Sequence, residues 1–283
     1  MSFKKLLHSY LATPRPGRHA TTIHASDLLN EKREWCEREV ALCHELDRER
    51  PPERLIPAQR AVFEASTMGQ TLITQWAVNL GIARGRWQCQ GCDALTKFGP
   101  RPHMCDVCGS QNLAYVESRF VSKFSRVSSG IDLLLDLGEP KLRVYEIKNV
   151  QKQDFMALAG PLAEHRWRTN LYLRVIAESD DPVRETINTE RAWVLYFVKG
   201  GYGYKDPDLG GGFSPFKEYE VVRDDADTQK YSERAHNLAR YMLGTGGRPH
   251  GICASIFQPR AKQCAVVDEC FSGKFPPGGV AGG

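Results

Sequence analysis

The chain has 283 residues, 41% of them hydrophobic and 25% charged, with a formal net charge of +4. This length and apolar content suit one large domain, or one domain with a small insert. No apolar run approaches the roughly 20 residues that a membrane-spanning helix needs, and the basic opening segment lacks the small-residue cleavage site of a secretory signal. We therefore expect a cytoplasmic protein that does not contact a membrane.

The N-terminal part, residues 1–86, is predicted to be mainly helical, and Pro51-Pro52 break its first helical stretch. A long helix is then expected from about Pro57 to Leu80, because proline suits the first turn of a helix and Gly81 suits its end. One face of this helix would be apolar. That face consists of Val62, Ala65, Gly69, Leu72, Trp76 and Leu80.

Residues 87–113 are predicted to form a small metal-binding insert. They contain two C-x₂-C pairs with twelve residues between them, formed by Cys89, Cys92, Cys105 and Cys108. Four thiolates spaced in this way close a tetrahedral zinc site, and the segment has little else to hold it together. We therefore expect a zinc ribbon. Because no coordination position is left open, we expect no catalysis there, although the ribbon could contact DNA or a protein partner.

The central part, residues 114–246, carries the strongest candidate site. Turn residues 138–140 join two apolar, strand-like segments, with Asp132 in the first and Glu146-Ile147-Lys148 at the end of the second. Strand alternation puts Glu146 and Lys148 on one face, and Asp132 approaches that face if the strands pair. Two carboxylates suit Mg²⁺ or Mn²⁺, and a lysine beside them can hold an attacking water or a phosphate. Charged residues also alternate along many exposed strands, but polar groups at the ends of apolar strands more often mark a site.

Several further elements complete the central part. We expect a strand at 114–121, a helix at about 153–178, strands at 192–198 and 216–222, and a helix at 224–243. The glycine-rich stretch 200–212 would be a hairpin tip or a mobile flap. From Lys141 to Arg174 there are seven basic residues and three acidic ones. This balance suits a polyanionic partner, although a solvated helix face has a similar composition.

A second group of cysteines lies near the two ends of the chain. Cys253, Cys264 and Cys270 fall within eighteen residues, in a C-terminal segment (247–274) whose composition does not indicate a core. Cys36 could supply a fourth thiolate and so join the two ends, whereas Cys43 is expected to be a buried helix residue. With nine cysteines and no secretion signal, metal binding is favoured over disulfides. Residues 275–283 are expected to be disordered.

Asp132 and Glu146-Ile147-Lys148 together resemble the PD-(D/E)XK nuclease motif. The chain as a whole resembles the RecB-type nucleases, most closely the iron–sulfur CRISPR-associated exonuclease family. The resemblance implies an α/β fold, a PD-(D/E)XK core whose mixed central sheet is flanked by helices, with the zinc ribbon as an insert. It also implies that Asp132, Glu146 and the carbonyl of Ile147 bind Mg²⁺ or Mn²⁺, and that Lys148 assists the attacking water.

The same resemblance gives the second cysteine group a role. Family members with a [4Fe–4S] cluster place one cysteine before the nuclease core and three after it, which here matches Cys36, Cys253, Cys264 and Cys270. The family usually shows C-x₂-C-x₅-C at the C-terminus. Here Ala261 stands at the position of the first of these cysteines, and Cys253 is the nearest substitute. A second zinc ion is the alternative occupant of this group.

Two other motifs of the family are altered. The usual G-x-x-x-H has Ile73 four residues after Gly69, so the histidine ligand is absent or is supplied from elsewhere, with Glu64 as a candidate. The usual Q-x-x-x-Y is represented by Arg168 and Tyr172, which lie one helical turn apart. The resemblance assigns this pair to the placement of DNA, although the same helix could also bury an apolar face.

The function implied by the resemblance is metal-dependent cleavage of DNA, as an exonuclease on single-stranded ends. Such an enzyme would serve recombination, repair or DNA-end processing, with partner proteins. The altered motifs leave one alternative, a catalytically degenerate nuclease fold that binds nucleic acid or joins a complex. The intact set of Asp132, Glu146 and Lys148 favours the enzyme, because an inactive site would not need three matched groups. A zinc-ribbon regulator would leave the second half of the chain unused.

Overall fold

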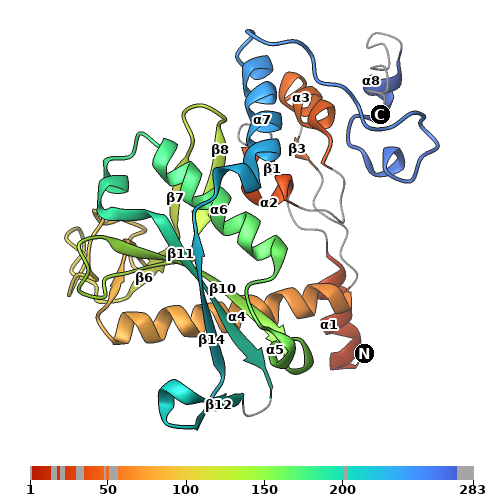
Figure 1. Cartoon of the computed structure of the whole chain (residues 1–283). Coiled ribbons are helices and arrows are strands. Elements are labelled where there is room, and N and C mark those ends of the chain that lie inside the picture. The colour runs from red at the N-terminus through yellow and green to blue at the C-terminus, as the bar shows by residue number, and fades with distance from the viewer. Residues whose placement is uncertain are drawn as a thin grey trace. The chain divides into compact units, whose positions relative to one another are not determined.

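The computed structural model describes residues 2–13, 18–19, 23–29, 35–47, 49–50, 57–200 and 203–272. The predicted disordered tail, 275–283, lies outside the described residues. By its internal contacts the chain forms two compact units (Figure 1). The first unit consists of Met1–Ala61, Lys123–Ser128 and Gln229–Gly283, and the second of Val62–Ser122 and Ser129–Thr228. These units cut across the predicted domain boundaries, because segments from both ends of the chain belong to the first unit.

The second unit is built on a five-stranded mixed sheet with the strand order β14-β11-β10-β9-β4. β10 and β11 run parallel, and each of the other neighbouring pairs is antiparallel. The predicted pairing across turn residues 138–140 is confirmed, since β9 and β10 pair with Leu133 opposite Tyr145. The five strands are β4 (Ala83–Arg84), β9 (Leu133–Leu135), β10 (Leu142–Gln151), β11 (Ile187–Lys199) and β14 (Phe216–Val222).

Helices pack on both faces of this sheet, in agreement with the predicted α/β class. α4 (Pro57–Asn79) contributes Ile73 to an apolar cluster that also contains Tyr145 and Ile147 of β10. Strand alternation turns Glu146 and Lys148 to the opposite face. On that face α6 (Ala163–Glu178) brings Arg168 to Glu146. The face under α4 is therefore apolar, whereas the face under α6 carries Glu146 and Lys148 beside buried apolar side chains of α6.

The single helix predicted at 153–178 is wrong. The segment forms two helices, α5 (Lys152–Ala157) and α6, with Gly160-Pro161 between them. Proline has no backbone N–H to donate, and it disfavours the helical conformation of the residue before it. The break fixes where α6 begins and therefore where its side chains meet the sheet.

The strand predicted at 114–121 is also divided. β6 (Leu113–Val116) pairs with β5 (Arg86–Cys89), whereas β7 (Ser118–Val121) neighbours β8 (Val127–Ile131) in a different sheet. Glu117 lies at the switch from one sheet to the other. No glycine or proline marks this switch, so the sequence pattern could not reveal it.

The glycine-rich stretch after β11 contains a hairpin, which is one of the two structures that were predicted for it. β12 (Tyr204–Asp206) and β13 (Gly212–Ser214) pair across the short helix η2 (Pro207–Leu209). Another short helix, η1 (Pro182–Thr186), precedes β11.

The first unit brings together the two ends of the chain. Arg234 of α7 (Asp225–Met242) pairs with Glu37 of α3 (Glu37–Glu45), and Arg260 pairs with Glu39 of the same helix. The other elements of this unit include α1 (Phe3–Ala12), β2 (Ile23–His24), α2 (Ala25–Leu28), the paired strands β1 (Arg18–His19) and β3 (Glu49–Arg50), η3 (Ala261–Gln263) and α8 (Val267–Phe271). Among the residues that the structure describes, no helix is long and apolar enough to cross a membrane.

Candidate active site

Asp132 lies where β9 and β10 stop pairing. The ladder ends at Leu133 and Tyr145, one residue short of Asp132 and Glu146. Beyond the ladder, Oδ2 of Asp132 accepts a hydrogen bond of 2.8 Å from the backbone N–H of Ile147. The carboxylate thus replaces the missing strand partner of Ile147, and this contact fixes Asp132 beside the Glu146-Ile147-Lys148 segment.

Glu146 is the most enclosed charge of the site, with an exposed fraction of 1%. Its Oε1 forms an ion pair with Nζ of Lys148 and lies 3.7 Å from Nη1 of Arg168. Its Oε2 is buried and has no hydrogen-bond partner among the described residues. Burial alone would raise the pKa of Glu146, but the charges of Lys148 and Arg168 outweigh it and lower the pKa. The site therefore holds a charged carboxylate with one oxygen left for a ligand.

The burial of the Asp132 carboxyl is less well compensated by positive charge than that of the Glu146 carboxyl. Burial raises its pKa well above the usual range, and the nearby charge of Glu146 raises it further, whereas Lys148 and the N–H of Ile147 act in the opposite direction. Two acidic groups close together in a region of low polarity repel each other. A cation placed between them would relieve this repulsion.

Arg168 and Tyr172 both lie on the α6 side of the site, as their spacing predicts. The guanidinium of Arg168 turns to Glu146, and its Nε is buried without a hydrogen-bond partner among the described residues. Tyr172 is only 7% exposed, and burial raises the pKa of its hydroxyl well above the usual range. Arg168 therefore offers a donor at the site, whereas the ring of Tyr172 is part of the core in this structure.

The position at which the resemblance expects a histidine ligand is occupied by a core residue. Ile73 is 6% exposed and packs in the apolar cluster with Ala77 and Ile147. On the same helix, the side-chain amide of Gln70 donates a hydrogen bond of 3.3 Å to Oε1 of Glu117. The sequence did not predict this contact. Alternation could show that Glu117 faces away from Val116, but not which residues it faces.

His165 is a second group that the sequence did not single out. It is 9% exposed, and its Nδ1 lies 2.8 Å from the hydroxyl of Tyr196. That hydroxyl also accepts a hydrogen bond from the backbone N–H of Leu162, so its own proton is free to go to Nδ1. Burial, together with the positive charge of Lys148, lowers the pKa of His165 to about 3. The imidazole is therefore neutral at physiological pH.

The four cysteines of the insert converge. The sulfur atoms of Cys89, Cys92, Cys105 and Cys108 all lie within 4.8 Å of one another. The backbone nitrogen of Gly91 lies 3.4 Å from the sulfur of Cys89, and that of Val107 lies 3.4 Å from the sulfur of Cys105. The Gly91 hydrogen bond is the main cause that lowers the pKa of Cys89 to about 6, whereas the pKa of Cys92 is raised to about 12 and that of Cys108 is also raised, with neighbouring thiols contributing to both. The convergence of the four sulfurs, rather than the pKa of any one thiol, favours a single metal ion.

The insert does not depend on these cysteines alone. Trp87 is 1% exposed and belongs to the same apolar cluster as Leu113 and the β10 residues Tyr145 and Ile147. The expectation that the segment has little else to hold it together is therefore wrong, because its two strands are anchored in the core of the second unit.

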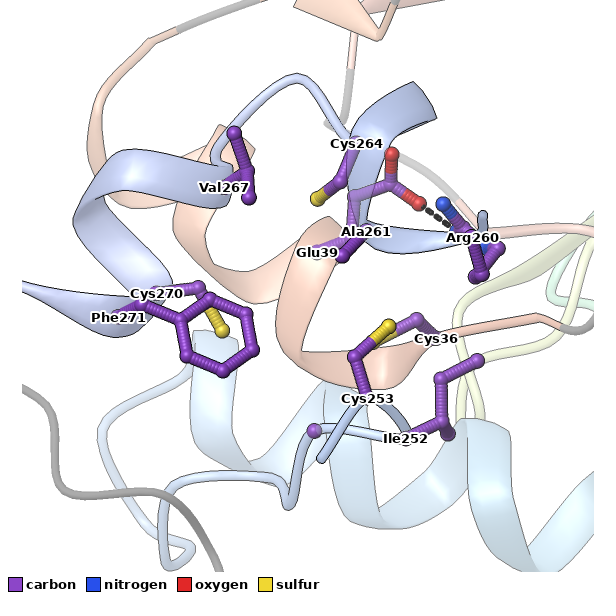
Figure 2. Close-up of a pocket in the computed structure, with 11 residues that line it drawn as sticks. Cys36, Glu39, Ile252, Cys253, Arg260, Ala261, Cys264, Val267, Cys270 and Phe271 are labelled. Atoms are coloured by element: carbon purple, nitrogen blue, oxygen red, sulfur yellow. Dashed lines mark hydrogen bonds and ion pairs between the residues drawn. The ribbon is translucent and has the colours of Figure 1, made fainter. Parts of the chain in front are cut away.

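The second cysteine group surrounds a pocket in the first unit (Figure 2). Cys36, Cys253, Cys264 and Cys270 all line one open pocket. Cys36 directly precedes α3, Cys264 follows η3, and Cys270 lies in α8. Glu39, fully buried and paired with Arg260, lines the same pocket. Cys43 does not line it and is fully buried in α3.

Comparisons with known proteins found distant structural likeness only. No known protein family matches the sequence, and no curated protein matches it. The crystal structure of SSO0001 has 17% identity and a TM-score of 0.34, covering 87% of this chain and 85% of the other. An alkaline exonuclease from Laribacter hongkongensis, LHK-Exo, has 10% identity and a TM-score of 0.40, covering 85% of this chain and 93% of the other. The LHK-Exo complex with dAMP gives a TM-score of 0.39 at the same identity. These TM-scores are too low to establish a shared fold.

Proposed function

We propose that the protein is a metal-dependent DNA nuclease with a PD-(D/E)XK core. The observation that carries this proposal is the meeting of Asp132, Glu146 and Lys148 at the end of the β9–β10 ladder. Two carboxylates beside an ammonium group can hold a divalent ion and an attacking water for hydrolysis of a phosphodiester. Action on single-stranded ends, and a place in recombination, repair or DNA-end processing with partner proteins, rest on the resemblance to RecB-type nucleases.

Three groups would hold the divalent ion. Asp132 and Glu146 supply hard oxygen donors, which suit Mg²⁺ or Mn²⁺. Ile147 supplies its carbonyl: the N–H and C=O of one residue lie on the same side of a strand, and its N–H points past the end of the ladder to Asp132. The unpartnered Oε2 of Glu146 fits such an ion. When bound, the ion would activate a water and stabilise negative charge on the phosphate.

Lys148 and Arg168 would act on the water and the DNA. Nζ of Lys148 lies against the Glu146 carboxylate, so a water held at that carboxylate is within its reach. The ammonium can orient this water and stabilise the charge that forms as it attacks. Arg168 has a buried Nε without an acceptor among the described residues and could pair with a phosphate. Tyr172 would support the position of Arg168 from the core.

We assign zinc to the four cysteines of the insert. Zinc–sulfur bonds of about 2.3 Å put the thiolates of a tetrahedral site about 3.8 Å apart. The sulfur separations are 3.4 Å between Cys89 and Cys108 and 3.7 Å between Cys92 and Cys105. This spacing fits a single ion, and four protein ligands would leave no open position for catalysis.

We assign a [4Fe–4S] cluster to Cys36, Cys253, Cys264 and Cys270. Unlike the sulfurs of the insert, these thiols line an open pocket and do not form a group within 4.8 Å of one another, and a four-iron cluster spaces its ligands more widely than one ion does. The pocket walls include the apolar residues Ile252, Val267 and Phe271, which suits a cluster shielded from water. Cys253 lies at the pocket although its spacing departs from the family pattern, so it can serve as the fourth ligand.

The proposed function is tested by incubating the intact protein with end-labelled linear DNA and with circular single-stranded DNA, in Mn²⁺ or Mg²⁺. We expect the linear single strand to be shortened from its ends and the circle to be spared. Asp132→Asn, prepared in the same way, serves as the matched control. Retarded migration of the single strand without cleavage in either metal would instead support the degenerate, DNA-binding alternative.

A further inference from the structure

α4 carries a row of exposed apolar side chains that the proposed function does not use. Met68, Leu72, Trp76 and Leu80 follow one another at intervals of four residues, so they are neighbours along one side of the helix. Leu80 directly follows the last residue of α4, and its backbone N–H still donates to the carbonyl of Trp76. The exposed fractions of the four side chains are 73%, 44%, 40% and 72% in that order. This apolar row therefore lies on the surface of the second unit.

The helix packs on the sheet through a neighbouring side. Ile73 and Ala77 are its buried residues, and both belong to the apolar cluster that contains side chains of β10. Leu72, Trp76 and Leu80 were predicted to form the apolar face of this helix, and all three are exposed instead. The sheet thus covers a narrow strip of α4 and leaves most of its large apolar side chains in contact with solvent.

The chemistry of the row restricts what can cover it. Residues 65–83 contain no Asp, Glu, Lys, Arg or His, whereas the outer face of a surface helix ordinarily carries charged residues. A contiguous exposed apolar patch marks an interaction site. DNA would find no cation here to pair with its phosphates, and a charged protein surface would bury unpaired charges against the row. The surface that covers the row must therefore be apolar and uncharged as well.

We infer that this row is the contact surface between two copies of the chain, which pair through α4. A second copy supplies an identical apolar row, so a two-fold arrangement covers both rows at once. Residues four apart form the ridges that interdigitate when two helices cross at about −50°. No like charges oppose the approach, because neither row contains a charged residue. This inference does not depend on the proposed nuclease activity.

The size of the row sets the strength expected of the dimer. A helix rises about 18 Å from Met68 to Leu80, so two crossing rows meet over about three turns. Four large side chains from each copy are far fewer than the roughly 20–30 residues a side of a standard stable interface. We therefore expect a reversible dimer with a dissociation constant on the order of 10 µM.

The test is sedimentation of the intact protein over a concentration range of about 1–100 µM. We expect the wild type to pass from monomer to dimer across this range. Met68→Glu and Leu72→Glu should each weaken the association by more than tenfold, because each places a carboxylate in the contact without a partner. Leu209→Glu is the matched control: it introduces the same charge at an exposed leucine of the second unit, but on η2, and should dimerise as the wild type does.

Two results would overturn the inference. One is a wild type that stays monomeric at about 100 µM; if Leu72→Glu then also lowers its free energy of unfolding, the chain itself covers the row. The other is a dimer that both Met68→Glu and Leu72→Glu leave intact, since its contact would lie elsewhere on the molecule. The readout is the mass of the particle, so the result is the same whether or not the protein cleaves DNA.

Discussion

Asp132 and Glu146 lie in opposite electrostatic surroundings. Glu146 has two cations beside it, Lys148 and Arg168, whereas Asp132 has the like charges of Glu146 and Glu117 nearby. In the protein free of divalent metal, the charge of Glu146 therefore stabilises the fold and the charge of Asp132 opposes it.

This contrast predicts opposite effects of two isosteric substitutions. Asp132→Asn should increase the free energy of unfolding by about 1 kcal/mol, because it removes a repelled charge while keeping an acceptor for the N–H of Ile147. Glu146→Gln should decrease it by roughly 1–3 kcal/mol, since two partly exposed cations lose their partner. Urea unfolding of the two variants and the wild type, without added Mg²⁺ or Mn²⁺, measures both changes. Equal destabilisation by the two substitutions would show that their surroundings do not differ as described.

His165 predicts a pH dependence of stability. Its pKa falls from 6.5 to about 3 on folding, so the folded protein keeps it neutral while the unfolded chain takes up a proton below pH 6.5. Its contribution is complete above pH 6.5 and is lost as the pH falls towards 3, by at most about 1.4 kcal/mol per pH unit. The measurement is the difference in unfolding free energy between wild type and His165→Gln across this range. A difference that does not change with pH would contradict the buried neutral imidazole.

At the scale of elements, the insert has two parts of different stability. Its strands β5 and β6 share an apolar cluster with β10 through Trp87, whereas the loops between them depend on the cysteines. Metal loss should therefore loosen the loops and leave the strands in place.

Cys92→Ser tests this division, because Cys92 is exposed and its loss leaves no cavity in the core. We expect fast amide exchange in residues 90–112, unchanged protection in β10, and loss of one zinc per chain, since a structural metal contributes folding free energy directly. Hydrogen exchange with elemental analysis gives both readouts. If the loops of the variant stayed as protected as in the wild type, the metal would have no structural role.

The sequence predicts elements where local signals are complete. Pro57 and Gly81 bound a helix that the structure places at Pro57–Asn79, and turn residues 138–140 join two strands that do pair. The prediction at 153–178 overlooked Pro161, a local signal that was available. The division at Glu117 had no local signal, because the two halves of 114–121 find their partners in segments far along the chain.

For the candidate site, too, the sequence predicted what depends on local signals and not what depends on distant segments. Asp132, Glu146 and Lys148 belong to one hairpin, and spacing and alternation sufficed to predict that they meet. Arg168 comes from α6, so only the tertiary structure brings it to Glu146 of the hairpin. The basic excess of residues 141–174 suggested contacts to phosphate, whereas Arg168 turns to Glu146 in this structure.

At the scale of the whole molecule, the two ends of the chain meet in the first unit. Nε of Arg38 donates a hydrogen bond of 3.1 Å to the carbonyl of Pro249, and Arg260 pairs with buried Glu39. The pocket with Cys36 and the C-terminal cysteines lies among these contacts. A cluster bound there would join segments more than 200 residues apart, as the pair Arg38–Pro249 already does with a separation of 211 residues.

Protein purified without oxygen should therefore be brown, and Cys36→Ser should lose the visible absorbance and open the N-terminal segment to protease. The fold should weaken because the cluster, like other metal centres, contributes folding free energy through ligands from both segments. Cys43→Ala is the control: Cys43 is buried in α3, which Cys36 directly precedes, but it does not line the pocket, so the colour should remain. A colourless wild type with two zinc ions per chain would rule out the cluster.

The most direct measurement is the rate at which Lys148→Met shortens an end-labelled single strand in Mn²⁺, relative to wild type. Lys148 lies against the Glu146 carboxylate but is not one of the proposed metal ligands. We predict that wild type cleaves, that the variant is slower by roughly 10²–10³-fold through loss of a group that stabilises the transition state, and that Mn²⁺ affinity is retained. Cleavage by the variant at the wild-type rate, or no cleavage by the wild type in Mn²⁺ or Mg²⁺, would contradict a catalytic site built from Asp132, Glu146 and Lys148.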